Sequence, residues 1–389
     1  MFADIVQRFE TSLNALYRER DARLAKGKRV TDLVSGNVNR AGFIFPPAAL
    51  GRALAQGAER TKMYAPDPLG QLAARRAIET YYRGEGLAVP SDQIILTPGT
   101  SLSYLYLFKL LANPGDEILC PRPSYPLLDS IADLCRIRLT GYRLLEKERW
   151  EIDLNHLRSA ITPKTRAIVL ISPHNPTGAV ATDQEIAGLA AIAQRHYLPV
   201  ISDEVFSEFL FHSRRLPRPG NRNLPLVFSL NGVSKMFALP GLKIGWIAVT
   251  GEPSQVKKAV HALDMISDTF LPVNEAAQAA LPVIFAEGKT FLRSYRGTVR
   301  KRAGAVTRVL AQAFWLSFVK PEGGFYVTVR MDKKGAEEEK AALGLLRNEG
   351  LLVHPGYFYD MEGSHFVISF VTPANVLNPA LQKIVSYFA

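Results

Sequence analysis

Short runs of apolar, β-branched residues recur along the middle of the chain. They cover residues 94–97, 117–120, 167–172, 199–202, 226–230 and 245–249. These runs lack the polar alternation of a strand with one face in water, and helical patterns such as 101–112 and 183–196 separate several of them. Strands of this kind, joined by helices, predict an α/β fold with a mostly parallel sheet that helices cover on both faces.

The two ends of the chain follow a different pattern. Residues 4–26 predict an amphipathic helix and residues 253–315 a long helical section, after which strand patterns at 323–331 and 365–371 flank a helix at 336–349. These elements predict a smaller α+β domain, built from residues 1–44 and 281–389. The large domain is expected to span residues 45–280.

Composition excludes several classes of protein. Apolar residues make up 47% of the 389 residues and charged residues 21%, as in ordinary globular proteins. No apolar run approaches the roughly 20 residues of a membrane span, and the N-terminus lacks the apolar block of a signal peptide. We therefore expect a cytoplasmic protein with no membrane partner. Cys120 and Cys135 are isolated and the histidines form no ligand pair, so no metal site is expected.

The net charge of +11 raises the question of nucleic-acid binding. The basic residues are spread along the chain, and the densest stretch, 293–308, resembles one solvated face of a helix. No nucleic-acid-binding motif is present. We expect no nucleic-acid partner, and acidic small ligands such as phosphates fit the charge better.

Polar residues follow several of the predicted strands, where ligands bind in open α/β sheets. Gly99, Thr100 and Ser101 follow the first strand and open a helix, which makes either an anion site or an ordinary N-cap. Asn175 lies in a tight turn after residues 167–172, where its amide can face a ligand or only complete the turn. Asp203 and Glu204 leave the strand 199–202 together, which is costly unless the carboxylates are paired or functional.

Lys235 follows the strand 226–230 among small and apolar residues. Such surroundings lower the pKa of an amine and make it a nucleophile. A lone lysine is usually exposed to solvent, so the neighbouring motifs decide how Lys235 is interpreted.

These motifs resemble a known family. SPHNPTG (172–178), SDEVF (202–206) and NGVSKMFALPGLKIGW (231–246) resemble the class I/II aminotransferases, which are fold type I enzymes that use pyridoxal phosphate. Segments 62–82, 121–134 and 320–327 resemble further parts of the same family. The resemblance implies a seven-stranded, mostly parallel sheet sandwiched by helices in the large domain, beside the smaller α+β domain. It also implies transfer of an amino group between an amino compound and a keto acid.

The resemblance implies a role for each matching residue. Lys235 would form the Schiff base and carry protons, and Asp203 would pair with the pyridine nitrogen, so both are catalytic candidates. Asn175 would contact the ring's phenolic oxygen, and Tyr125 would stack on the ring face. Further contacts, mostly to the phosphate, would come from Gly99, Thr100, Ser101, Ser234 and Lys243. Tyr64 would reach the cofactor of a second subunit, which implies a homodimer with shared sites. Gly36 would line the substrate pocket.

Three positions depart from the family pattern. Phe206 stands where a tyrosine usually donates to the phenolic oxygen, and Lys243 replaces an arginine that binds the phosphate. Val367 falls where the family has the arginine that grips the substrate's α-carboxylate. Either another cation, such as Arg40 or Arg330, takes this role, or the substrate carries no carboxylate beside its amine.

Two other interpretations share the same residues. Lyases, decarboxylases and racemases of this fold also need Lys235, Asp203 and Asn175. A sensor that binds the cofactor without catalysis is a further alternative, although no winged-helix segment precedes the predicted domain.

Overall fold

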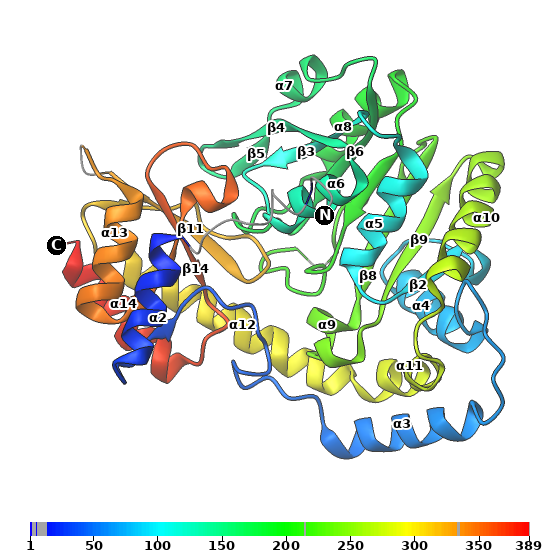
Figure 1. Cartoon of the computed structure of the whole chain (residues 1–389), viewed down its shortest axis with the longest axis horizontal. Coiled ribbons are helices and arrows are strands. Elements are labelled where there is room, and N and C mark those ends of the chain that lie inside the picture. The colour runs from blue at the N-terminus through cyan, green and yellow to red at the C-terminus, as the bar shows by residue number, and fades with distance from the viewer. Residues whose placement is uncertain (2–4, 6–13, 214, 333–334, 389) are drawn as a thin grey trace.

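A computed structural model describes residues 1, 5, 14–213, 215–332 and 335–388. Its centre is an eight-stranded sheet with the order β2-β9-β8-β7-β6-β3-β4-β5 (Figure 1). The strands are β2 (Ile94–Thr97), β3 (Glu117–Arg122), β4 (Arg138–Glu146), β5 (Trp150–Ile152), β6 (Thr165–Ile171), β7 (Val200–Asp203), β8 (Leu226–Gly232) and β9 (Gly245–Gly251). The consecutive neighbours from β4 to β8 run parallel, whereas β9 is antiparallel to both β2 and β8. The mostly parallel α/β sheet is thus confirmed.

The sheet has one strand more than the seven expected. The edge formed by β4 and β5 is antiparallel, and β5 has three residues. Most of β4 is partly or fully exposed, so it lacks the continuous apolar run that marks the central strands. Its sequence, RLTGYRLLE, therefore lacks the uninterrupted apolar pattern that predicts the other strands.

Helices cover both faces of this sheet. One face packs against α5 (Thr100–Leu111), α6 (Leu127–Cys135) and α10 (Pro253–Phe270). The other face packs against α7 (Leu154–Ser159) and α8 (Asp183–Arg195) at one end, and against α3 (Pro47–Arg60), α4 (Leu72–Gly84) and α11 (Glu275–Glu287) at the other. Neighbouring strand residues enter opposite layers: Ile95 joins the first, while Ile94 and Leu96 join the second.

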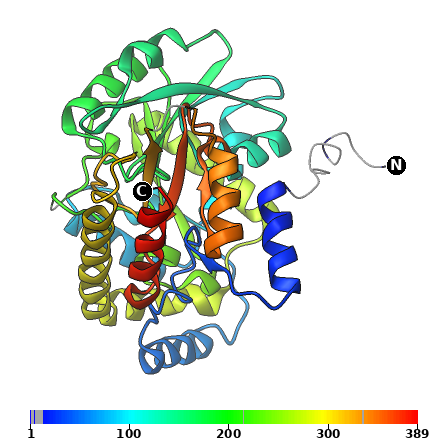
Figure 2. The same cartoon turned by 90° about the vertical axis from the view of Figure 1, so that its left-hand side faces the viewer.

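A second, antiparallel sheet has the order β10-β11-β14-β13. Its strands are β10 (Leu316–Ser317), β11 (Tyr326–Met331), β13 (His354–Pro355) and β14 (His365–Ser369). The helices around it are α2 (Ala15–Ala25), α12 (Lys289–Leu310), α13 (Glu338–Gly344), which continues as a π-helix over Leu345–Glu349, and α14 (Ala374–Tyr387). Figure 2 shows α2 beside α13, so segments from both ends of the chain pack together.

The N-terminal segment is tied to the C-terminal part by backbone pairing. β1 (Thr31–Asp32) runs parallel to β12 (Leu351–Leu352), and the Ser369 N–H donates to the carbonyl of Leu33. Residues 4 and 6–13 of the expected N-terminal helix lie outside the described residues. The division of the chain at residues 44 and 280 stays a prediction, and residue 280 falls inside α11.

The remaining helices are short or irregular. They are α9 (Val233–Met236) and the 3₁₀ turns Ser91–Gln93, Pro219–Asn221, Pro240–Leu242 and Gly356–Tyr359. The expected helical section 253–315 is divided into α10, α11 and α12, with breaks at Leu271, which has a positive φ of 66°, and at Gly288. In the described part of the chain, no helix is both long and apolar enough to cross a membrane.

Candidate active site

A cavity of about 490 Å³ lies at the carboxyl ends of the central strands, where ligands bind in α/β sheets. Eight of the predicted site residues line it: Gly36, Thr100, Ser101, Tyr125, Asn175, Asp203, Ser234 and Lys235. Seven of them end or follow the strands β2, β3, β6, β7 and β8, and Gly36 comes from the N-terminal segment. Residues far apart in sequence are therefore brought together where the sequence predicted a site.

A second, larger cavity of about 1130 Å³ lies between α4, α11 and α12. Met236, the last residue of α9, and Phe237 after it border this cavity, but none of the predicted site residues does. The smaller cavity, which holds the convergent polar groups, is therefore the candidate active site.

Lys235 lies on α9, the single turn of helix that follows β8. Its Nζ donates a hydrogen bond to the carbonyl oxygen of Gly36 at 3.1 Å. Burial lowers the pKa of this amine to about 8, because water no longer stabilises the ammonium form. A substantial fraction of Lys235 is then neutral near pH 7–8, which a nucleophile or a proton acceptor requires.

Asp203 ends β7 and presents a partly buried carboxylate to the cavity. It accepts hydrogen bonds from the hydroxyl of Tyr104 at 2.8 Å and from the N–H of Val205 at 3.1 Å. Burial raises its pKa to about 6, against the opposing effect of these two donors. No salt bridge reaches Asp203 from the described residues, so the site offers a carboxylate that lacks a cation.

Tyr104 is the contact to Asp203 that the sequence reasoning missed. It lies on α5, buried, three residues after Ser101. A tyrosine within an apolar helix is usually a core residue, and its spacing alone does not show which strand its hydroxyl will meet. The one feature of the sequence that could have pointed to Tyr104 is that its helix begins at the predicted anion site.

Asn175 follows β6 in the turn that leads to Gly178, and its side chain faces the cavity. Its Oδ1 is buried and has no hydrogen-bond partner. Since a buried amide is normally paired, this group suits a ligand that completes its hydrogen bonds.

The predicted phosphate contacts divide into two groups. Thr100 and Ser101 line the cavity at the N-terminus of α5, where the first N–H groups lack acceptors within the helix. Gly99 precedes them with a φ of 103°, a conformation that glycine adopts without strain. Lys243 is exposed, and neither it nor Gly99 is part of the cavity lining.

Phe206 lines the cavity where the family pattern has a tyrosine. Its ring packs edge-to-face against Phe325 and Tyr326, with centroids 4.8 and 6.3 Å apart. This position therefore offers no hydroxyl to a ligand.

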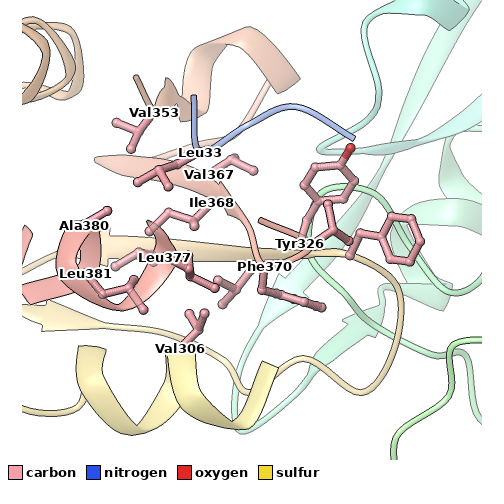
Figure 3. Packing of buried hydrophobic residues seen from close by; sticks show 14 of the residues in the cluster. Leu33, Val306, Tyr326, Val353, Val367, Ile368, Phe370, Leu377, Ala380 and Leu381 are labelled. Atoms are coloured by element: carbon pink, nitrogen blue, oxygen red, sulfur yellow. The ribbon is translucent and has the colours of Figure 1, made fainter. Parts of the chain in front are cut away.

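Val367 is fully buried in the core of the small sheet and does not line the cavity. Figure 3 shows it near Leu33, Val353 and Ile368. The two expected substitutes do not line the cavity either: Arg330 pairs with Glu146 at 3.3 Å and Asp332 at 2.8 Å, and Arg40 lies outside the lining.

Tyr64 is 78% exposed and does not reach the cavity of its own chain. Within the residues that the structure describes, no group of histidines, cysteines and carboxylates could hold a metal ion. The polar groups of the cavity instead suit an organic cofactor. A cationic ring nitrogen fits Asp203, a polar ring substituent fits Asn175, a carbonyl carbon fits Lys235 and an anionic group fits the start of α5.

Comparison with known proteins identifies the family. The family described as aminotransferase class I and II matches residues 28–384. The chain belongs to this family. Members of the family use pyridoxal phosphate, so this aminotransferase is a pyridoxal-phosphate enzyme.

Several named proteins are similar to this aminotransferase. Glutamate-pyruvate aminotransferase AlaA from Escherichia coli is 27% identical over 375 residues, covering 94% of this chain and 91% of that protein. Tyrosine aminotransferase from Dictyostelium discoideum is 27% identical over 83% of this chain and 80% of its own length. The solved alanine aminotransferase from Pyrococcus furiosus superposes with a TM-score of 0.91 at 25% identity, covering 100% of this chain and 99% of that one. The fold type I architecture is confirmed.

Proposed function

We propose that Lys235 anchors pyridoxal phosphate covalently in this cavity, and that the enzyme uses it to move an amino group between an amino compound and a keto acid. The observation that carries this proposal is the convergence of three groups on one cavity. They are the low-pKa amine of Lys235, the partly buried carboxylate of Asp203 and the amide of Asn175, whose Oδ1 is buried without a partner.

Each residue has a task that follows from its surroundings. When bound, the cofactor supplies an electron sink for the substrate carbon. Asp203 keeps the ring nitrogen protonated, because a buried carboxylate favours a cation beside it. Asn175 would donate through its Nδ2 to the ring's phenolic oxygen, and Tyr125 would cover the ring face. Lys235 would hold the cofactor through its amine and, as a neutral base, would carry the proton that leaves the substrate carbon.

The phosphate is bound at the start of α5. Gly99 positions the backbone, and Thr100 and Ser101 supply N–H and hydroxyl donors. Ser234 adds a hydroxyl from α9, next to Lys235. We assign to Lys243 a supporting positive charge. A lysine gives a point charge without the bidentate geometry of arginine.

Absorbance and mass spectrometry test the anchor. The purified protein with added pyridoxal phosphate is expected to show a visible band, and borohydride reduction is expected to leave a phosphopyridoxyl group on the peptide that contains Lys235. Lys235→Ala is expected to lose both signals. The exposed Lys147 provides a matched control, since Lys147→Ala is expected to retain both. Labelling of a different lysine in the native protein would overturn the assignment.

We further propose that the enzyme is a homodimer with shared sites, in which Tyr64 reaches the phosphate in the second subunit. The exposure of Tyr64, together with that of Met63, Phe270 and Leu271, supports a surface that another subunit covers. A cytoplasmic location completes the proposal. Fractionation of the cells checks it.

A further inference from the structure

Two tyrosines give the cavity a neutral hydrogen-bonding wall. Tyr125 and Tyr326 both line it, and neither hydroxyl bonds to another described residue. Tyr326 lies beside the anchor: a Cβ added to Gly36 would meet the Tyr326 hydroxyl at 2.5 Å and Lys235 Nζ at 3.5 Å. Figure 3 shows the hydroxyl of Tyr326 pointing out of the hydrophobic cluster. The cavity therefore presents the free phenol of Tyr326 close to the amine, and that of Tyr125 elsewhere on the same lining.

The same wall lacks a partner for a carboxylate. Among the described residues that line the cavity, Lys235 is the one with a basic side chain, and the proposed function already uses it. Arg122, on the neighbouring strand β3, pairs with Asp129 at 2.7 Å and with Asp360 at 3.3 Å. A carboxylate that enters such a site loses water without gaining a cation, which is costly.

The sheet behind Tyr326 is also uncharged on the face around Val367. Val367 is paired with Thr328 on one side and His354 on the other, and directly opposite residues share a face. The Thr328 hydroxyl is buried without a hydrogen-bond partner. His354 lies between the hydroxyls of Tyr17 at 2.7 Å and Tyr359 at 3.1 Å, and burial lowers its pKa to about 4, so it is neutral at pH 7.

The nearby charge is negative. Burial raises the pKa of Tyr326, and Tyr125 and Asp32 raise it further. Tyr326 therefore keeps its proton and can donate a hydrogen bond. The carboxylate of Asp32 holds the loop toward Gly36 by accepting from the N–H groups of Val34 and Ser35, and its charge opposes a second carboxylate.

We propose that the amino donor carries a hydroxyl-bearing group, in place of a carboxylate, on the carbon that holds its amine. Amino alcohols and amino sugars share this chemistry, and the hydroxyls of Tyr326 and Tyr125 bind it. This inference rests on the proposed function, because it takes Lys235 as the group at which the substrate amine reacts.

Serinol (2-amino-1,3-propanediol) and serine form a matched pair of probes, since they differ by one hydroxymethyl group in place of the carboxylate. Each is titrated into the holoenzyme while the visible absorbance of the bound cofactor is followed, which measures binding, and the pyridoxamine phosphate formed is then quantified. Serinol is expected to bind at least about tenfold more tightly than serine, since serine leaves a carboxylate unpaired. Isopropylamine is expected to bind more weakly than serinol, because it has no hydroxyl.

Tyr326→Phe removes one hydroxyl and keeps the ring. It is expected to reduce the preference for serinol over isopropylamine about tenfold, while the cofactor absorbance stays unchanged. Tyr197→Phe is the matched control, because its hydroxyl bonds Glu252 on the surface and its loss is expected to leave the preference intact.

Tighter binding of serine than of serinol would overturn the inference and leave the proposed function standing. An unchanged preference in Tyr326→Phe would overturn the assignment to this wall. Tighter binding of 1,3-diaminopropane than of serinol would show that the site recognises a second ammonium group and not a hydroxyl, which would also overturn the inference. Failure of the proposed function looks different: the Lys235-dependent band is then absent before any amine is added.

Discussion

The pair formed by Tyr104 and Asp203 sets the electrostatics of the site at the scale of single residues. Burial moves the pKa of Asp203 to about 6, close to the pH at which the enzyme must keep it ionised. The hydroxyl of Tyr104 acts against this shift, because it donates to the ionised form at 2.8 Å. Loss of the hydrogen bond from Tyr104 would therefore lower the fraction of Asp203 that is ionised and available to a cationic ring.

Tyr104→Phe is expected to raise the pKa of Asp203 further. The carboxylate would then be neutral over a wider range, so cofactor affinity at pH 7 is expected to fall about tenfold. The contribution of ionised Asp203 to the affinity should hold above about pH 6 in the native protein and decline below it; in the variant that decline should begin at higher pH. Protonation of Lys235 below about pH 8 acts on both proteins alike. Absorbance titrations with pyridoxal phosphate across this range measure both effects.

Tyr295→Phe is the matched control for this experiment, since the Tyr295 hydroxyl is buried without a partner. It is expected to bind the cofactor as the native protein does. An identical pH profile in Tyr104→Phe and the native protein would show that Tyr104 has a packing role only.

The residues that sequence reasoning placed in the site share a simple property: most of them directly follow a central strand or lie at the start of a helix. Asn175, Asp203 and Lys235 therefore had to meet at one edge of the sheet. The hydrogen bond from Tyr104 could not be predicted in this way, because it depends on how α5 rotates against β7. The position of Tyr326 beside Gly36 depends on packing between segments from different parts of the chain.

At the scale of elements, the carboxyl end of β7 separates two neighbouring acids. Asp203 faces the cavity, while Glu204 is fully buried and pairs with the fully buried Arg218 at 2.7 Å. Glu204 also accepts hydrogen bonds from Ser202 and from Ser229 on β8. This resolves the alternatives left by the sequence: one acid lines the site and the other is held in a buried ion pair.

Breaking this pair on one side is expected to destabilise the enzyme strongly. Arg218→Met leaves the Glu204 charge buried and unpaired, so the free energy of unfolding should fall by about 3–5 kcal/mol. The double variant Glu204→Gln/Arg218→Met should recover a large part of this loss. Urea unfolding followed by circular dichroism measures each value.

The exposed pair of Arg52 and Glu287 serves as the comparison. Glu287→Gln is expected to change the free energy of unfolding by no more than about 1 kcal/mol. A similarly small effect of Arg218→Met would contradict a structural role for the buried pair.

The central strands were predictable because they are apolar without interruption, as buried parallel strands are. β4 and β5 were not, since an exposed sheet edge carries mixed residues. The division of residues 253–315 into three helices depends on Leu271 and Gly288, and a helical periodicity alone does not show such breaks.

At the scale of the whole molecule, the proposed dimer makes each site depend on two chains. Lys235→Ala would remove the proposed anchor, and Tyr64→Phe would remove the phosphate contact that we propose each chain supplies to the other subunit. The two variants are unfolded and refolded together. Each mixed dimer then has one site with both native residues, because the Tyr64→Phe chain supplies Lys235 and the Lys235→Ala chain supplies Tyr64. Activity is then expected to exceed the sum of the separately refolded variants, approaching about one quarter of the native value for random pairing.

Light scattering coupled to size-exclusion chromatography measures the assembly of each sample in the same experiment. A monomer in solution, or activity equal to the sum of the separate variants, would contradict the shared site.

The carbonyl of Gly36, which accepts the hydrogen bond from Lys235, lies in a loop whose position depends on pairing with strands near the C-terminus. Leu33 accepts from Ser369 at the end of β14, and β1 pairs with β12. During synthesis the lysine and the large sheet therefore emerge from the ribosome well before the strands that fix the loop. Capture of the cofactor in its final geometry is consequently an event that follows translation of β14, and a nascent chain arrested earlier holds an open, unfinished pocket.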